Sequence, residues 1–236
     1  MIVLNVTTSA HQFLRDKIIT GELTSGEKLN EATLSMKLGI SRPPLRESLR
    51  LLEKDHIVVN IPRKGTHVTE LSIRDFIEGT QIREMLECYA VDLLKASNIR
   101  NMPKVTLALN KALNLPIPFN SVDPEQLLNT MKVFLGFHFC MVESTGNSRL
   151  TQVYQSIMWN LARYQFIYFC VNGTAQRSLD EHKRALEFIR DGSYEEAKEQ
   201  LREHINYTVE VVKHRILHPA ISRAGSFQSK FQTKGG

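Results

Sequence analysis

Three histidines in the C-terminal half of the chain stand on the apolar faces of three separate predicted helices. The positions three and four residues away from each are mostly apolar, so each imidazole points with the buried face of its helix. A single inward histidine is usually an ordinary core residue. Three on different helices favour a shared site, because imidazoles that are buried together need a common partner, most often a divalent transition metal. The sequence therefore predicts that His138, His182 and His204 converge on one internal site that can hold a metal.

A second polar group lies on the core side of an earlier predicted helix. Arg83 and Glu87 are in phase with Leu86 and the other apolar residues of that helix. An i, i+4 ion pair usually lies on a solvated face. Because this pair turns inward, we expect it to line an internal effector cavity, with Asn160 and Tyr164 as further candidates. Arg83 would supply the positive charge that a carboxylate effector needs.

The elements that must position these side chains are helices. From residue 72 onward strand signals stop, and breaks rich in Gly, Pro and Asn separate helical segments. We predict an all-α domain at 72–217, followed by a poorly ordered basic tail at 218–236. Its helices are expected at about 72–97, 102–114, 124–144, 148–171, 175–191 and 194–217.

The N-terminal part of the chain has a different pattern. Residues 30–54 carry two stripes of leucines at helical spacing, separated by Gly39, which can end the first helix, and Ser41, which can cap the second. This predicts a helix-turn-helix, whose second helix starts sharply at a pair of prolines. Off its leucine face this helix carries a cationic ridge at i, i+4, i+8 spacing, formed by Arg42, Arg46 and Arg50.

Three arginines also suit any solvated amphipathic helix, so the flanking elements decide the interpretation. A helix is predicted upstream at 11–20, and two short strands are predicted at 57–61 and 66–69, joined by a basic turn that contains Gly65. The order of three helices and a β-hairpin is that of a winged helix-turn-helix, which places its second motif helix in the major groove. We therefore predict a DNA-binding domain at 1–71, in a chain that is mainly α.

Residues 14–71 also resemble the N-terminal domain of the GntR family of bacterial transcription regulators. The family's I-x-x-G-x-x-x-x-G-x-x-L-x-E opening, its L-G-I-S-R turn and its R-x-G-x-x-V wing stand here in order. Where the family usually has Thr, this chain has Pro43. Together the resemblance and the basic ridge and turn assign operator binding to Ser41, Arg42, Pro43, Arg46, Arg50, Lys64 and Gly65, with Gly65 approaching the minor groove.

The second domain resembles the ligand-sensing FCD domain of the FadR-type subgroup, which implies that 72–217 serves effector binding and dimerisation. The resemblance is carried by QIREMLE from residue 81, FHFCMVESTGN from 137 and EHKRALEFIRDGSYEEAKEQLREH from 181. In many members an Asp four residues before the first histidine joins the three histidines around a zinc- or nickel-type metal, and here that position is Phe134. Three imidazoles with water or an effector carboxylate remain a workable ligand set.

Composition sets outer limits on the function. The chain has 236 residues, 42% of them hydrophobic and 23% charged, with a formal net charge of +5 that permits nucleic-acid binding without demanding it. No apolar run is long enough for a transmembrane helix and no signal peptide is evident, so we expect a cytoplasmic protein. Three widely spaced cysteines without a C-x-x-C motif make a disulfide framework an unsuitable interpretation.

The favoured function is a ligand-responsive transcription regulator, with repression as the family default, that binds a pseudo-palindromic operator as a homodimer. It is not expected to be an enzyme. The alternative, a metal-dependent hydrolase built on the three histidines, lacks an accompanying general-base or nucleophile motif. An architectural DNA-binding protein without an effector would leave the inward polar groups without a purpose.

Overall fold

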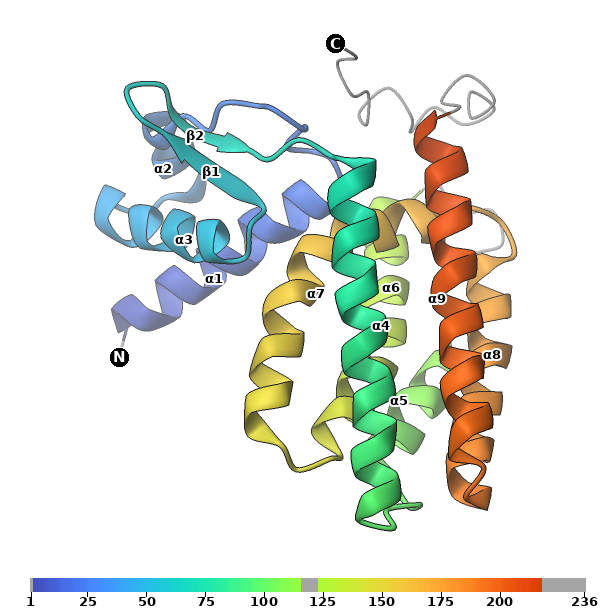
Figure 1. Ribbon diagram of the computed structural model, residues 1–236. Helices are drawn as coiled ribbons and strands as arrows, with labels where there is room; N and C mark the ends of the chain where they lie inside the picture. Colours follow the sequence, from blue (N-terminus) through green and yellow to red (C-terminus); the bar gives the residue numbers. More distant parts are fainter. Residues whose placement is uncertain (1, 116–122, 218–236) are drawn as a thin grey trace. The chain divides into compact units, whose positions relative to one another are not determined.

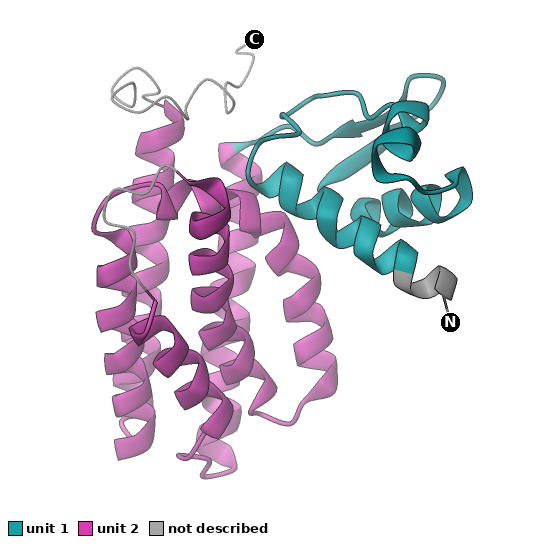
Figure 2. Cartoon of the chain, turned by 180° about the vertical axis from the view of Figure 1, so that it is seen from behind, with its two compact units in different colours: residues 1–72, 219–236 teal, residues 73–218 magenta. Residues whose placement is uncertain are grey.

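The computed structural model of the protein describes residues 2–115 and 123–217 (Figure 1). The chain divides into two compact units, the first ending at Ser72 and the second beginning at Ile73 (Figure 2). The tail expected at 218–236 lies outside the described residues. Within the described ranges, no helix is long and apolar enough to cross a membrane.

Unit 1 has the element order of a winged helix-turn-helix. Its elements are α1 (Ile2–Ile19), α2 (Glu31–Leu38), α3 (Arg42–Lys54), β1 (Val58–Ile61) and β2 (Gly65–Val68). Helix α1 begins well before the predicted residue 11, and its earlier turns are held by α3, because the buried Ser48 hydroxyl donates to the carbonyl of Thr7 at 2.8 Å. The strands pair antiparallel with Val58 opposite Val68 and Ile61 opposite Gly65.

The turn between α2 and α3 differs from prediction at one cap. Gly39 ends α2 in the left-handed region at φ 63°, as expected. Ser41 occupies the N-cap of α3 but its side chain makes no capping hydrogen bond. The reason is local: a capping hydroxyl accepts from the N–H two or three positions later, and these positions are Pro43 and Pro44, which have none. The Ser41 hydroxyl is therefore not used to cap the helix.

One apolar core holds unit 1 together. The leucine stripe of α3, which includes the fully buried Leu45 and Leu52, packs against Leu14 and Ile18 of α1 and the hairpin residue Val68. Because the leucines face inward, the opposite face of α3 is left to solvent. The wing turn is tightened by positive φ values at Arg63 and Gly65, of 64° and 93°.

Unit 2 is all helical, which confirms the predicted fold class. Its helices are α4 (Ile73–Ala96), α5 (Pro103–Leu113), α6 (Pro124–Glu143), α7 (Ser148–Phe169), α8 (Thr174–Asp191) and α9 (Tyr194–Leu217). Each lies within a few residues of its predicted range. Figure 1 shows α4 beside α9 and α9 beside α8, the pairs in extensive contact.

Two glycines set the helix spacing and reversal around the interior of unit 2. A Cβ at Gly79 would lie 3.0 Å from a methyl carbon of Leu161, so glycine allows the close approach of α4 to α7. Gly192 takes φ 84°, where L side chains are strained, and ends α8 so that α9 can run back beside it. The antiparallel pair brings residues about ten positions on either side of this turn to similar heights.

Candidate functional site

The structure brings the three histidines of unit 2 together. His138 comes from α6, His182 from α8 and His204 from α9, and all three are buried. One nitrogen of each lies within 4.8 Å of the corresponding nitrogen of the others. Their ring centroids are 4.5, 4.8 and 5.2 Å apart. The three imidazoles thus form a single group that could hold a metal ion.

His138 is fixed by hydrogen bonds on both ring nitrogens. Arg83 Nη2 lies 3.0 Å from His138 Nε2, and Glu87 Oε2 lies 2.9 Å from His138 Nδ1. A guanidinium can only donate, so Nε2 is the acceptor and Nδ1 carries the proton that Glu87 accepts. Burial lowers the pKa of His138 to about 4, although Glu87 opposes the shift. The ring is therefore neutral, with its lone pair on Nε2.

Glu87 is the centre of a fully buried ionic network. Its Oε1 accepts from Arg83 Nε and from the hydroxyl of Tyr154, both at 2.7 Å. Burial alone would raise the pKa of Glu87, but Arg83 and His138 outweigh it and hold that pKa well below its usual range. The carboxylate is ionised, and the pair with Arg83 is electrically neutral. Such a network fixes the orientation of His138.

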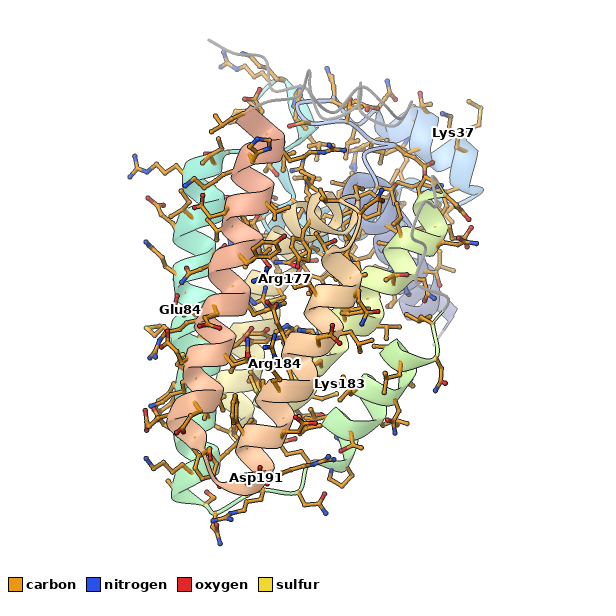
Figure 3. All side chains as sticks on the ribbon, turned by 90° about the vertical axis from the view of Figure 1, so that its right-hand side faces the viewer. Lys37, Glu84, Arg177, Lys183, Arg184 and Asp191 are labelled. Atoms are coloured by element: carbon orange, nitrogen blue, oxygen red, sulfur yellow. The ribbon has the colours of Figure 1, made fainter. Side chains whose placement is uncertain are left out.

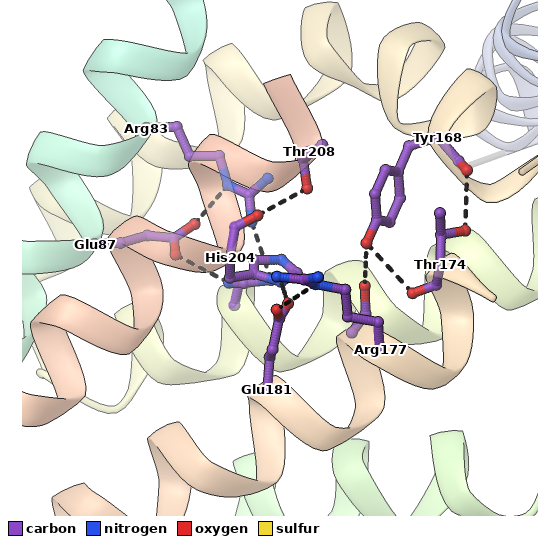
Figure 4. Close-up of polar contacts among 10 residues, drawn as sticks. Arg83, Glu87, Tyr168, Thr174, Arg177, Glu181, His204 and Thr208 are labelled. Atoms are coloured by element: carbon purple, nitrogen blue, oxygen red, sulfur yellow. Dashed lines mark hydrogen bonds and ion pairs between the residues drawn. The ribbon is translucent and has the colours of Figure 1, made fainter. Parts of the chain in front are cut away.

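A matching carboxylate orients His204. Glu181 Oε2 lies 2.7 Å from His204 Nδ1, and Glu181 Oε1 accepts from Arg177 Nε at 2.7 Å (Figure 4). The pKa of Glu181 is lowered, because the imidazole and the guanidinium outweigh the opposing effect of burial. An ionised carboxylate only accepts, so His204 Nδ1 carries the proton that Glu181 accepts, and Nε2 is the nitrogen left to face the other histidines. Arg177 also lies over the ring of Tyr207, 3.5 Å from its centroid.

Arg177 links this inner carboxylate to the outside of α8, the helix that also carries Lys183 and Arg184 and ends at Asp191 (Figure 3). The side chain of Arg177 is 47% exposed, whereas that of Glu181 is 2% exposed. The other arginine of the site, Arg83, is fully buried. The two carboxylates are therefore balanced by one internal and one surface cation.

His182 differs from the other two histidines because neither of its nitrogens has a hydrogen-bond partner among the described residues. Its ring stacks on Phe137 at 4.2 Å and lies 5.8 Å from the ring of Phe134. Burial, followed by the neighbouring histidines and Arg83, lowers the pKa of His182 well below its usual value. Arg83 Nη1 likewise lacks a partner within the described ranges. Buried polar atoms left unsatisfied are costly, so these atoms mark a place for a ligand.

The donor set fits a divalent transition metal. Two imidazoles donate Nδ1–H to carboxylates, which leaves Nε2 of each as the nitrogen that can ligate, the usual arrangement around a bound metal. The third has no competing partner, and burial keeps His138 and His182 neutral, as metal ligation requires. The candidate group contains no carboxylate among the residues described, and one turn before His138 the buried Phe134 occupies the same helix.

The structure corrects the expected placement of Asn160 and Tyr164. Both share the carboxylate of Asp75, with Asn160 Nδ2 at 3.2 Å and the Tyr164 hydroxyl at 3.4 Å from Oδ2. Tyr154, the residue of α7 that reaches the histidine network, lies six and ten positions earlier. At about 1.5 Å per residue, Asn160 and Tyr164 are about 9 and 15 Å further along the helix axis. Sharing a helical face was therefore insufficient to bring them to the histidines.

Sequence reasoning missed the site residues Tyr154, Glu181 and Arg177. A signal for two of them was present, because Arg177 and Glu181 repeat on α8 the i, i+4 spacing of Arg83 and Glu87 on α4. This signal is weak, because the side chain of Arg177 is 47% exposed and does not lie on the buried face of the helix. Glu181, which directly precedes His182 in the chain, is nevertheless the partner of His204.

The predicted DNA-binding residues lie on the solvent side of unit 1. Arg46 Nε donates to Glu31 on α2 at 2.8 Å, a contact across the motif that sequence reasoning did not anticipate, and Arg50 lies 3.4 Å from Glu47. Both are surface ion pairs, which cost little to exchange for phosphate contacts. The exposed members are Ser41, Arg42, Pro43, Arg46, Arg50 and Lys64, and Gly65 is half-buried.

Comparison with known proteins bears on both units. Residues 7–68 match the family described as bacterial regulatory proteins of the gntR family, and residues 78–207 match the FCD domain. An uncharacterised HTH-type transcriptional regulator of Bacillus subtilis, YdhC, is 27% identical over 205 residues, covering 85% of this chain and 88% of the relative. The Escherichia coli HTH-type transcriptional repressor GlaR is 23% identical over 209 residues, covering 86% and 94%.

A solved structure supports the same assignment at the level of the fold. Escherichia coli McbR/YncC superposes with a TM-score of 0.71 at 20% identity, over 89% of this chain and 98% of that one. The two family matches follow each other in the order of the two units, and the second alone spans more than half of the 236 residues. The chain is therefore a transcriptional regulator that belongs to the GntR family and carries an FCD domain.

Proposed function

We propose that this regulator binds a pseudo-palindromic operator as a homodimer, through an N-terminal domain at 1–71, and senses a small ligand through a helical domain at 72–217. The exposed arginine ridge of α3 supports the first part, since the same helix buries its leucines. Arg42 and Arg46 would contact bases, and Lys64 and Gly65 of the wing would approach the backbone and the minor groove. Two copies are needed because one winged domain buries little groove surface.

Repression is the proposed outcome of operator binding. Several relatives are named as repressors, including GlaR and a gluconate operon transcriptional repressor of Bacillus licheniformis. A repressor that responds to a ligand needs a sensing site apart from its DNA contacts. In this chain the buried histidine group belongs to the unit that follows the winged domain.

The observation that carries the sensing function is His182, a buried imidazole whose two nitrogens, like Nη1 of Arg83, have no hydrogen-bond partner among the residues that the structure describes. His138, His182 and His204 would hold a divalent ion of the zinc or nickel type. Bound there, the ion would act as a Lewis acid toward an anionic ligand. Arg83 would add a charge-assisted contact to a carboxylate effector, with Glu87 holding the guanidinium in place.

A hydrolase built on the same histidines is less well supported. Hydrolysis needs a general base that can accept a proton from water. Both carboxylates near the histidines are ionised but already accept from an imidazole and a guanidinium. Neither Glu87 nor Glu181 therefore has the freedom that such a base requires.

The proposal is tested by operator binding of the full-length protein with and without small organic acids, together with the metal content of the purified protein. We expect a subset of acids to change the affinity for DNA. His182→Ala should lose this response and most of the metal while it keeps the affinity for the operator. A variant that still responds to the acid would show that the histidine group is not the sensing site.

A further inference from the structure

We infer that a divalent metal and a carboxylate ligand bind this protein as a coupled pair, each raising the affinity for the other, because the metal-holding group among the described residues contains no anionic ligand. This inference rests on the proposed metal and effector site and adds a thermodynamic rule to it. It concerns the histidine group of His138, His182 and His204 together with Arg83 and Phe134.

A divalent ion alone would leave this buried site with an excess of positive charge. Histidine binds a metal through the lone pair of a neutral imidazole, so the three histidines bring no negative charge to the ion. The two nearby carboxylates are already neutralised, Glu87 by Arg83 and Glu181 by Arg177. A divalent ion would therefore add two uncompensated positive charges to a site whose histidines are 2% to 4% exposed. Such a charge is costly to bury, and an anion bound with it removes much of the cost.

Arg83 also favours an anion beside the metal. Its Nη2 donates to His138 Nε2, the nitrogen whose lone pair a metal would take. Metal binding would therefore remove that acceptor from a fully buried guanidinium whose Nη1 already has no partner within residues 2–115 and 123–217. An anion beside the metal would give the guanidinium acceptors again. A carboxylate has two oxygens, so one can serve the metal while the other serves Arg83.

The three histidines fill only part of the coordination shell of a metal ion. Three imidazole nitrogens leave a tetrahedral ion one free position and an octahedral ion three. One helical turn before His138, the same face of α6 carries Phe134. The Phe134 ring packs against Phe169, and its centroid lies 5.8 Å from that of the His182 ring. A phenyl ring cannot ligate a metal. The open positions are thus left to a molecule from solution, and a charged one has the advantage over water.

By linkage, the coupling must be reciprocal: if the carboxylate raises the metal affinity by some factor, the metal raises the carboxylate affinity by the same factor. The effect has a direct control within the chain. An aspartate at position 134 would place a fixed carboxylate one turn before His138 on the same helical face. It would supply the missing charge, and the benefit of an added carboxylate should then largely disappear.

The test is the affinity of the metal-free, full-length protein for Ni²⁺, measured by isothermal titration calorimetry in acetate and in neutral acetamide at equal concentration. The binding of acetate to free Ni²⁺ is subtracted. We expect acetate to tighten Ni²⁺ binding about tenfold or more, within the usual range of coupling between sites, and acetamide to leave it unchanged. Acetate affinity, measured with and without Ni²⁺, should change by the same factor.

Two variants of one residue complete the design. Phe134→Asp should bind Ni²⁺ more tightly than the wild type without acetate, and its acetate effect should fall below about twofold. Phe134→Leu, the matched apolar control, should keep the full acetate effect. Circular dichroism checks that both variants are folded, and the wild-type comparison of acetate with acetamide stands even where Phe134→Asp does not fold.

The possible failures are distinguishable. Ni²⁺ binding that depends on His182 but is equal in acetate and acetamide would overturn the coupling and leave the metal site intact. Ni²⁺ binding that is absent in both the acetate and the acetamide solution, or unchanged in His182→Ala, would overturn the metal site and the coupling with it. An equal acetate effect in Phe134→Asp and Phe134→Leu would show that the anion does not replace a missing protein ligand.

Discussion

Acidification of the metal-free protein should destabilise its helical domain through the buried histidines. The pKa of His138 is about 4 in the folded protein against an ordinary value of 6.5. Below pH 6.5 the unfolded chain binds a proton that the folded chain does not, so the free energy of unfolding falls as the pH drops from 6.5 toward 4. The gap of 2.5 pKa units, at about 1.4 kcal/mol each, corresponds to about 3 kcal/mol for His138.

At pH 5 the pH has fallen through about 1.5 units of this gap, so protonation of His138 in the unfolded chain lowers the free energy of unfolding by about 2 kcal/mol. His182 is shifted in the same direction and should add a similar loss over this window. The pKa of Glu87 is also lowered, but for a carboxyl group this shift favours the ionised form and stabilises the folded protein, so its contribution is lost only below the ordinary value of 4.5. The loss expected between pH 6.5 and 5 is therefore about 4 kcal/mol from two histidines.

The assay is urea unfolding in EDTA at pH 7.5, 6.5, 5.5 and 5.0, followed by the fluorescence of Trp159, the single tryptophan, which lies on α7. The matched variant is His182→Leu, which removes one titrating group and two unsatisfied nitrogens. It should be at least as stable as the wild type at pH 7.5, and its loss on acidification should be smaller by about 2 kcal/mol.

Equal pH dependence in His182→Leu and the wild type would refute this reasoning, because the buried imidazole would then not be the group that resists protonation. A strong loss of stability in His182→Leu at pH 7.5 would also count against it. That result would mean that both nitrogens of His182 have good partners in the metal-free protein.

Three further outcomes are expected. Arg42→Ala and Arg46→Ala should each weaken specific operator binding by about 1 to 3 kcal/mol at fixed salt without loss of fold, and gel-shift titrations that find wild-type affinity in both would show that the recognition helix was wrongly placed. The protein should be a homodimer on its operator, and a strict monomer in native mass spectrometry would contradict the two-site reading of a palindrome. Glu181→Gln should lower Ni²⁺ affinity about 10- to 100-fold, because the amide no longer fixes the proton on Nδ1 of His204, and unchanged affinity would remove Glu181 from the site.

Local sequence patterns determined most of the fold. Helix positions, the turn at Gly39 and the alternating strands of the wing depend on spacing and turn chemistry within about ten residues, which the sequence displays directly. Helical phase also predicted that the three histidines turn inward. Helical phase does not report on capping. The missing capping bond of Ser41 follows instead from Pro43 and Pro44, which have no N–H to donate.

The partners of the inward side chains were decided by tertiary structure alone. Glu87 meets His138 across 51 positions and Tyr154 across 67, and Glu181 meets His204 rather than its neighbour His182. Phase states which face of a helix a residue occupies, but the height at which two helices meet is set by how their whole surfaces pack. The sequence therefore determined that polar groups are buried in the helical domain. Only packing decided which of them are satisfied, and it left both nitrogens of His182 without a partner in the described part of the chain.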